Sequence, residues 1–124
     1  GKGRERITVN DVVSLNVIEA LDALNIRFVL TPTRSGSTPR NISRFKPGAW
    51  ILAFTRNPAT SRFLAFSYGV CPFLIRSEKE YWHGAILDSV RDSGLIRPGE
   101  RVVLTEGVSP GREGTDSLII LTVD

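Results

Sequence analysis

The chain has 124 residues, of which 41% are hydrophobic and 23% are charged, and this size and balance are typical of one globular domain. Its net charge of +3 comes from scattered basic residues, clustered only at Lys2, Arg4 and Arg6, so nucleic-acid binding is disfavoured. The single cysteine, Cys71, excludes an internal disulfide and suits a reducing cytoplasm. Because no apolar run approaches the roughly 20 residues of a membrane span, we expect no membrane partner.

The spacing of apolar residues predicts helices and strands that alternate along most of the chain. We interpret residues 1–6 as a linker or a cut end and residues 7–124 as one domain. A first helix is expected from Val12 to Leu24, with Asn10 or Asp11 as its cap. Further helices are expected at residues 39–45, 58–64 and 78–93, and strands at residues 27–31, 50–54, 70–75, 101–105 and 118–123.

This order of elements indicates a layered α/β fold with a mainly parallel sheet. The strand that begins at Trp50 is apolar throughout, which is typical of a strand covered on both faces, so Trp50 is expected in the core. A loop of about ten residues joins the last two strands. Since a right-handed parallel crossover normally needs about a dozen or more residues, we expect this pair to be antiparallel.

A polar stretch between the first predicted strand and the next helix has the composition of a phosphate site. Six of its residues carry side-chain donors that suit a phosphate group: Thr33, Arg34, Ser35, Ser37, Thr38 and Arg40. Gly36 lets an anion approach the main chain, and Thr38 followed by Pro39 is expected to cap and start the helix. A strand end, a hydroxyl-rich turn and a helix start together predict phosphate binding, while an ordinary polar connection is the alternative.

The sequence offers no catalytic apparatus and no metal site. Residues 107–111 match the G-x-S-x-G pattern of a nucleophile elbow, but Pro110 has no N–H to donate to an oxyanion. One histidine and one cysteine cannot build a typical zinc site. His83 is expected to have a surface or half-buried structural role, and Cys71 to be a small buried hydrophobe. Trp82, near a predicted helix start, could instead border a ligand.

Three motifs in a fixed order carry a family resemblance. They are the turn Thr33-Arg34-Ser35-Gly36-Ser37-Thr38, the break Lys46-Pro47 and the helix start Thr55-Arg56-Asn57-Pro58. At these spacings the chain, from about Ile7 onward, resembles the C-terminal domain of pyruvate kinase. The resemblance implies a three-layer α/β/α sandwich whose five-stranded, mostly parallel sheet ends in an antiparallel strand.

The resemblance also implies a parent enzyme and its partners. The parent would transfer a phosphoryl group from phosphoenolpyruvate to ADP in glycolysis, in the cytoplasm, with magnesium and potassium but with no cofactor in this domain. A catalytic barrel domain of the same parent chain would be its partner, and this domain would carry an effector site and part of a homotetramer interface. The apolar run from Leu118 to Leu121 is expected at a subunit contact, with a strand covered by its own helices as the alternative.

The family's effector residues can be carried over position by position. The phosphate of a phosphorylated small-molecule effector would be held by the turn, that is by Thr33, Arg34, Ser35, Gly36, Ser37 and Thr38. A loop would close over the sugar, consisting of Ser109, Pro110, Gly111, Arg112, Glu113, Gly114 and Thr115, and Trp82 would be a further contact.

One departure from the family bears on the choice of effector. The stretch between Trp82 and Gly94 is shorter than the family's pattern and lacks the arginine that would grip a second phosphate. We therefore expect a monophosphate, such as a sugar phosphate or AMP, in preference to fructose bisphosphate. A stand-alone phosphometabolite-binding protein without catalytic activity is the alternative function.

Overall fold

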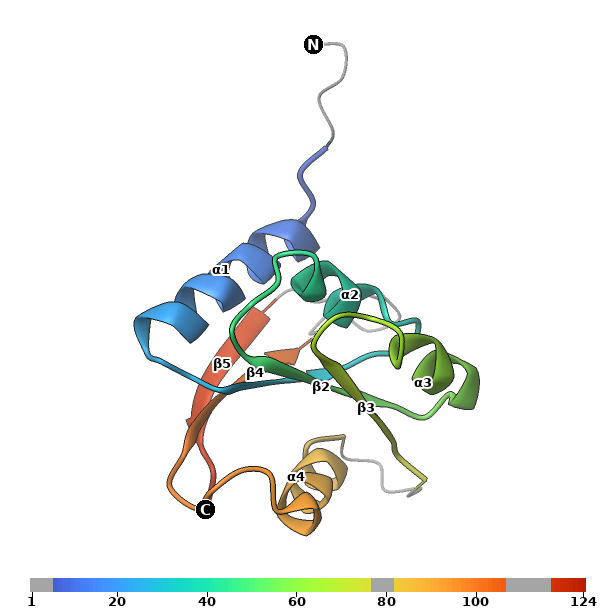
Figure 1. The fold of residues 1–124 in the computed structure, drawn as a ribbon, viewed down its shortest axis with the longest axis vertical. Coiled ribbons are helices and arrows are strands. Elements are labelled where there is room, and N and C mark those ends of the chain that lie inside the picture. Colours follow the sequence, from blue (N-terminus) through green and yellow to red (C-terminus); the bar gives the residue numbers. More distant parts are fainter. Residues whose placement is uncertain (1–5, 77–81, 107–116) are drawn as a thin grey trace.

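The computed structural model describes residues 6–76, 82–106 and 117–124. In these ranges the helices and strands alternate as the sequence predicts (Figure 1). The elements are α1 (Val9–Ala23), β1 (Phe28–Pro32), α2 (Ser37–Ser43), β2 (Trp50–Thr55), α3 (Pro58–Leu64), β3 (Val70–Leu74), α4 (Trp82–Ser93), β4 (Arg101–Glu106) and β5 (Ser117–Thr122).

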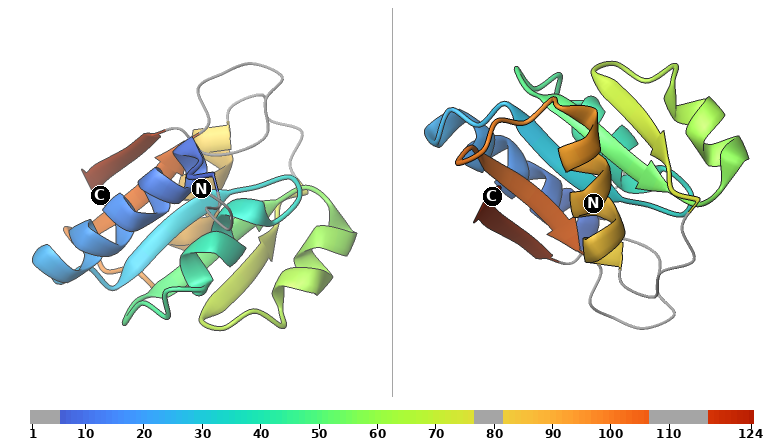
Figure 2. Two further views of the ribbon diagram at one scale, coloured as in Figure 1. Left: turned by 90° about the horizontal axis from the view of Figure 1, so that it is seen from above. Right: turned by 90° about the horizontal axis from the view of Figure 1, so that it is seen from below.

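The five strands form one sheet in the order β3-β2-β1-β4-β5. The four strands from β1 to β4 run parallel, and β5 pairs with β4 in the antiparallel direction, so the predicted direction of the last strand is confirmed. Helices α1, α2 and α3 cover one face of the sheet and α4 covers the other, as the two views of Figure 2 show. The α/β sandwich predicted from the sequence is therefore confirmed.

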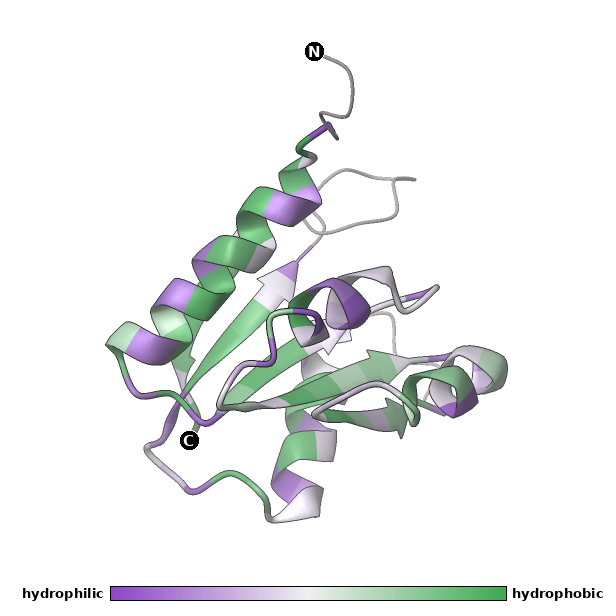
Figure 3. Ribbon diagram, turned by 45° about the horizontal axis from the view of Figure 1, so that its top comes forward, coloured by the Kyte–Doolittle hydropathy of each residue, from purple (hydrophilic) through white to green (hydrophobic). Residues whose placement is uncertain are grey.

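The inner strands supply two separate apolar layers because successive side chains of a strand point to opposite faces. In β1, Val29 packs in the layer beneath α1 and α2, whereas Phe28 and Leu30 pack in the layer against α4. Figure 3 shows how hydrophobic these strands are along their length. Burial on both faces is the usual condition of a parallel sheet, and it leaves polar groups to the sheet's edges.

Two predictions about the core are wrong. Trp50 is 57% exposed, because it is the first residue of β2 and lies at the amino edge of the sheet, where burial begins only with Ile51. Cys71 is half-buried, since among the described strands β3 lies at the edge of the sheet and has only β2 as a neighbour. Its partial burial raises the pKa of the Cys71 thiol.

The first helix begins earlier than its apolar spacing suggests. Thr8, and not Asn10 or Asp11, is the N-cap, and its side chain and that of Asp11 form a capping box. The backbone N–H of Thr8 and the side-chain amide of Asn41 hold the pKa of Asp11 below its ordinary value near 3.8. The bond from Asn41 Nδ2 to Asp11 Oδ1, 3.1 Å long, also ties α2 to α1.

The last strand is an open edge. Ile119 and Ile120 are 40% and 44% exposed, and in the described part of the chain β5 has only β4 as a neighbour. Its own helices therefore do not cover β5 on both faces, which disfavours the alternative that the sequence left open. In the same described ranges, every helix is too short or too polar to cross a membrane.

A paired arginine and glutamate join the amino ends of the neighbouring strands β1 and β4. Arg27, just before β1, donates from Nε and Nη2 to the two carboxylate oxygens of Glu100, just before β4, at 2.7 Å each. The backbone N–H of Arg97 donates to the same carboxylate. The hydrogen bonds from Arg27 are the main reason why the pKa of Glu100 lies below its ordinary value near 4.5.

Replacement Glu100→Gln is expected to lower the stability of the fold in a pH-dependent way. Because the folded-state pKa of Glu100 is lowered, its contribution is fully present above pH 4.5 and is lost as the pH falls through the folded-state value. Urea unfolding of both proteins at several pH values measures this. The difference in unfolding free energy should be largest at neutral pH and should shrink in acid, whereas the exposed Glu19→Gln control should show no such trend.

Candidate phosphate-binding site

The candidate site lies at the carboxyl edge of the parallel strands. The sheet order reverses at β1, with β2 and β3 on one side of it and β4 on the other. In open parallel α/β sheets, ligands bind outside the carboxyl ends of the strands near such a reversal. The polar turn that follows β1 leaves the sheet at this position.

Hydrogen bonds within and around the turn hold it in a closed conformation. The backbone N–H of Thr33 donates to the carbonyl of Phe54 at 2.8 Å, which extends the pairing of β1 with β2. Thr33 Oγ1 accepts from the N–H of Gly36 at 2.7 Å, and the Thr60 hydroxyl donates to the carbonyl of Arg34 at 2.7 Å. The N–H of Ser37 donates to Ser35 Oγ at 3.3 Å. The N–H groups of Gly36 and Ser37, at the start of the helix, are thus used by the turn itself.

Gly36 is required where it stands. Its φ of +91° lies in the left-handed region, and a Cβ there would come within 3.0 Å of Leu64 Cδ2. Gly36 is also the N-cap of α2, which begins at Ser37. The prediction that Thr38 caps this helix is therefore wrong, because the left-handed residue starts the helix earlier and Thr38, only 3% exposed, lies inside it.

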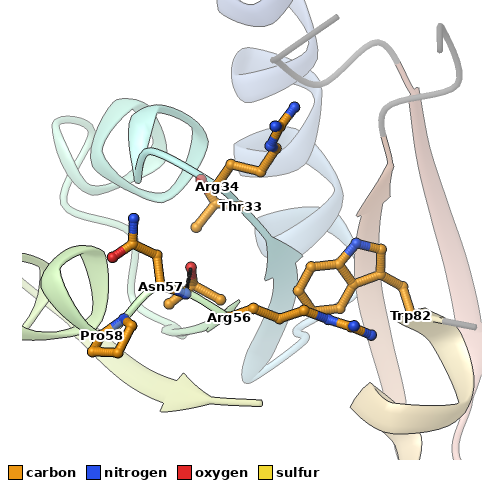
Figure 4. A pocket seen from close by; sticks show the side chains of 7 residues that line it. Thr33, Arg34, Arg56, Asn57, Pro58 and Trp82 are labelled. Carbon is orange, nitrogen blue, oxygen red and sulfur yellow. Dashed lines mark hydrogen bonds between the residues drawn. The ribbon is translucent and has the colours of Figure 1, made fainter. Parts of the chain in front are cut away.

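The residues that the sequence predicts to bind phosphate do not all line the same cavity. Thr33 and Arg34 line a cavity of about 630 Å³, together with Thr55, Arg56, Asn57, Pro58 and Trp82 (Figure 4). We call this cavity the β1–β2 cavity. Ser35 is exposed, Gly36 and Thr38 are buried, and Ser37 lines a different cavity between α1 and α2. Two of the six turn residues, and Trp82, are brought together as expected, but the other four are not.

Arg56 is the functional candidate that the sequence reasoning missed. Its guanidinium carbon lies 4.7 Å from the centre of the Trp82 ring, which is within cation–π range. In Figure 4, Arg56 reaches across to Trp82, whereas the guanidinium end of Arg34 extends away from Arg56. The sequence did contain a signal for Arg56. Arg34 and Arg56 each follow a threonine, and each lies just after the buried residues of a strand.

Asn57 borders the β1–β2 cavity with its side chain held in place. Its side-chain oxygen caps α3 by accepting from the N–H groups of Ala59 and Thr60 at 2.9 and 3.4 Å. The predicted start of this helix at Asn57 and Pro58 is therefore confirmed. Because the oxygen is occupied, the remaining capacity of the carboxamide is its NH₂ donor, which suits an anion.

Comparison with known proteins agrees with this architecture. The model of the family "Pyruvate kinase, alpha/beta domain" matches residues 11–121. The chain belongs to this pyruvate kinase family. The resemblance noted in the sequence is thereby confirmed.

Several pyruvate kinases are similar over almost the whole chain. The pyruvate kinase of Thermococcus litoralis is 41% identical over 120 residues, which are 96% of this chain and 25% of that protein. Those of Clostridium acetobutylicum and Geobacillus stearothermophilus are 31% and 35% identical, over 98% and 90% of this chain and 26% and 19% of their own lengths. The chain thus spans about a quarter or less of these relatives, in their C-terminal part.

Other residues of this pyruvate kinase domain that the sequence singled out can now be placed. His83 Nε2 lies 2.5 Å from Glu106 Oε1, so this half-exposed histidine joins the first turn of α4 to the end of β4. In the ranges that the structure describes, no three His, Cys, Asp or Glu side chains gather as a metal site would require. The predicted closing loop, Ser109–Thr115, lies outside the described residues.

Proposed function

We propose that this pyruvate kinase domain is a regulatory and assembly domain that binds a phosphorylated effector in the β1–β2 cavity. The parent enzyme would transfer a phosphoryl group from phosphoenolpyruvate to ADP, with its magnesium and potassium held by a separate barrel domain of the same chain. The observation that carries the proposal is that Arg34, Arg56 and Trp82 border one open cavity at the carboxyl edge. Among the described residues that line this cavity, none is acidic.

Side chains would make the first contacts with the phosphate. Guanidinium groups form charge-assisted hydrogen bonds with phosphate oxygens, and each such bond contributes about 1.5–3 kcal/mol before ordering costs. The Thr33 hydroxyl accepts from Gly36 and still has its own proton to donate. After the costs of association, micromolar to millimolar affinity is the expected range.

The arrangement of α4 supports a ligand with a single phosphate. Arg91 is the one lysine or arginine of α4, lies in its last turn and pairs with Asp88 at 3.8 Å. His83, which follows Trp82, is held by Glu106, so α4 provides no lysine or arginine next to Trp82 for a second phosphate. We accordingly favour a sugar monophosphate or AMP over fructose bisphosphate.

Thermal unfolding with a set of phosphorylated metabolites tests this assignment. Monophosphates should raise the melting temperature more than fructose bisphosphate does. A monophosphate at a hundredfold excess over its Kd should stabilise the folded protein by about 2.7 kcal/mol. Arg34→Gln should raise the monophosphate concentration needed for the same shift about tenfold, since it removes one charge-assisted bond. Ser35→Asp should also weaken the shift, because it places a negative charge beside Arg34. The exposed Arg101→Gln, at the opposite edge of the sheet, is the matched control.

Two outcomes would refute the effector assignment. The first is tight binding of the bisphosphate with weak binding of monophosphates, which would show that the protein also binds the second phosphate group. The second is an unchanged response in both Arg34→Gln and Ser35→Asp.

The proposed assembly role depends on the open edge of β5. Leu118, Ile119 and Ile120 give this strand an apolar surface that its own helices leave partly exposed. An edge strand of this kind offers unpaired backbone groups to another chain. We propose that β5 lies at a subunit contact of a homotetramer.

Sedimentation equilibrium of the full-length parent measures the assembly role. Ile120→Lys should shift the protein toward smaller species, because a charge on the contact surface would lose its hydration. Leu95→Lys, at a residue of similar exposure outside the sheet, should leave the assembly unchanged. A parent that is monomeric at micromolar concentration would refute the role.

A further inference from the structure

A second cavity, next to the β1–β2 cavity, is lined by three arginines. Its volume is about 740 Å³, and its polar lining consists of Arg56, Arg62, Arg76 and Ser61. It lies beside α3 and the end of β3, so we call it the α3–β3 cavity. Arg56 and Pro58 line both cavities, which therefore lie next to each other.

The fold itself brings these arginines together. The register pairs Thr55 of β2 with Leu74 of β3, so Arg56 and Arg76 leave the sheet at the same edge from adjacent strands. Adjacent strands are only about 4.8 Å apart. Arg62 belongs to α3, which packs against both β2 and β3, and it lies next to Ser61 in the same cavity wall.

Two of the charges of this cavity, those of Arg62 and Arg76, are not balanced by a carboxylate among the residues described around it. Its described lining contains no carboxylate, and Arg56, Arg62 and Arg76 are all exposed. Within residues 6–76, 82–106 and 117–124, no carboxylate is paired with Arg62 or Arg76. Like charges that face one cavity repel one another and raise its positive potential, which favours an anion there.

We propose that the α3–β3 cavity is a second anion site, which binds a phosphate group of a ligand distinct from the one in the β1–β2 cavity. Guanidinium groups match phosphate geometry and can each donate two parallel hydrogen bonds. Ser61 adds a hydroxyl donor. The site does not require that the β1–β2 cavity bind an effector, but Arg56 couples the two cavities, since it lines both and stacks on Trp82.

Titration with inorganic phosphate, followed by NMR of the 124-residue chain, tests this site. The Nε–Hε resonances of Arg62 and Arg76 and the amide of Ser61 should shift with a common millimolar dissociation constant. Sodium chloride at the same ionic strength should not reproduce the shifts, because dispersed counter-ions do not form directed bonds. Arg62→Gln and Arg76→Gln should each weaken binding about tenfold, and the lysine replacements, which keep the charge, should weaken it less.

Matched variants separate this site from the proposed effector site. Arg34→Gln removes a cation of the β1–β2 cavity alone, so the Arg62 and Arg76 shifts should persist in it. Arg101→Gln controls for the loss of one positive charge elsewhere. The proposal is overturned if chloride gives the same shifts, if the two glutamine variants bind phosphate as the parent chain does, or if Arg34→Gln abolishes all shifts.

Discussion

The β1–β2 cavity depends on how the chain turns at the end of β1. Thr33 makes two hydrogen bonds there, one from its backbone to Phe54 and one from Gly36 to its hydroxyl. The first holds the turn against β2, and the second folds the chain back toward α2. Thr60 fixes the other side of the turn by donating to the carbonyl of Arg34. Thr33 and Arg34 are the residues of the turn that line the β1–β2 cavity.

A doubly covered sheet explains why the chemistry lies at one edge. The inner strands are apolar on both faces, so polar and charged side chains can enter only where the strands end. Arg34, Arg56 and Arg76 follow the adjacent strands β1, β2 and β3 at their carboxyl ends. The result is a row of positive charge across the edge, and Trp82 from α4 provides an aromatic surface for its central member.

The order and type of the elements could be predicted because each rests on local physics. Apolar runs of strand length, the Asn57 cap and the short connection before β5 each constrain the backbone without reference to the rest of the fold. Trp50 shows the limit of this reasoning, since an apolar run does not reveal where the covering helices stop.

The site was only partly predictable for a different reason. Composition showed that the turn is rich in hydroxyls, but not that the hydroxyls of Thr33 and Ser35 bond to amides of the same turn. The roles of Arg56 and of the α3–β3 cavity depend on the strand order β3-β2-β1-β4, which places the ends of distant segments side by side. No local pattern in the sequence contains that order.

The most direct test of this account compares Gly36→Ala with Gly48→Ala, a glycine with open space around it. A closed turn with Gly36 in the left-handed region predicts that Gly36→Ala lowers the unfolding free energy by about 1–2 kcal/mol and also weakens binding of a monophosphate. Gly48→Ala should change neither quantity by a comparable amount. Equal stability and equal monophosphate affinity in the two variants would contradict the closed turn as the feature on which the site depends.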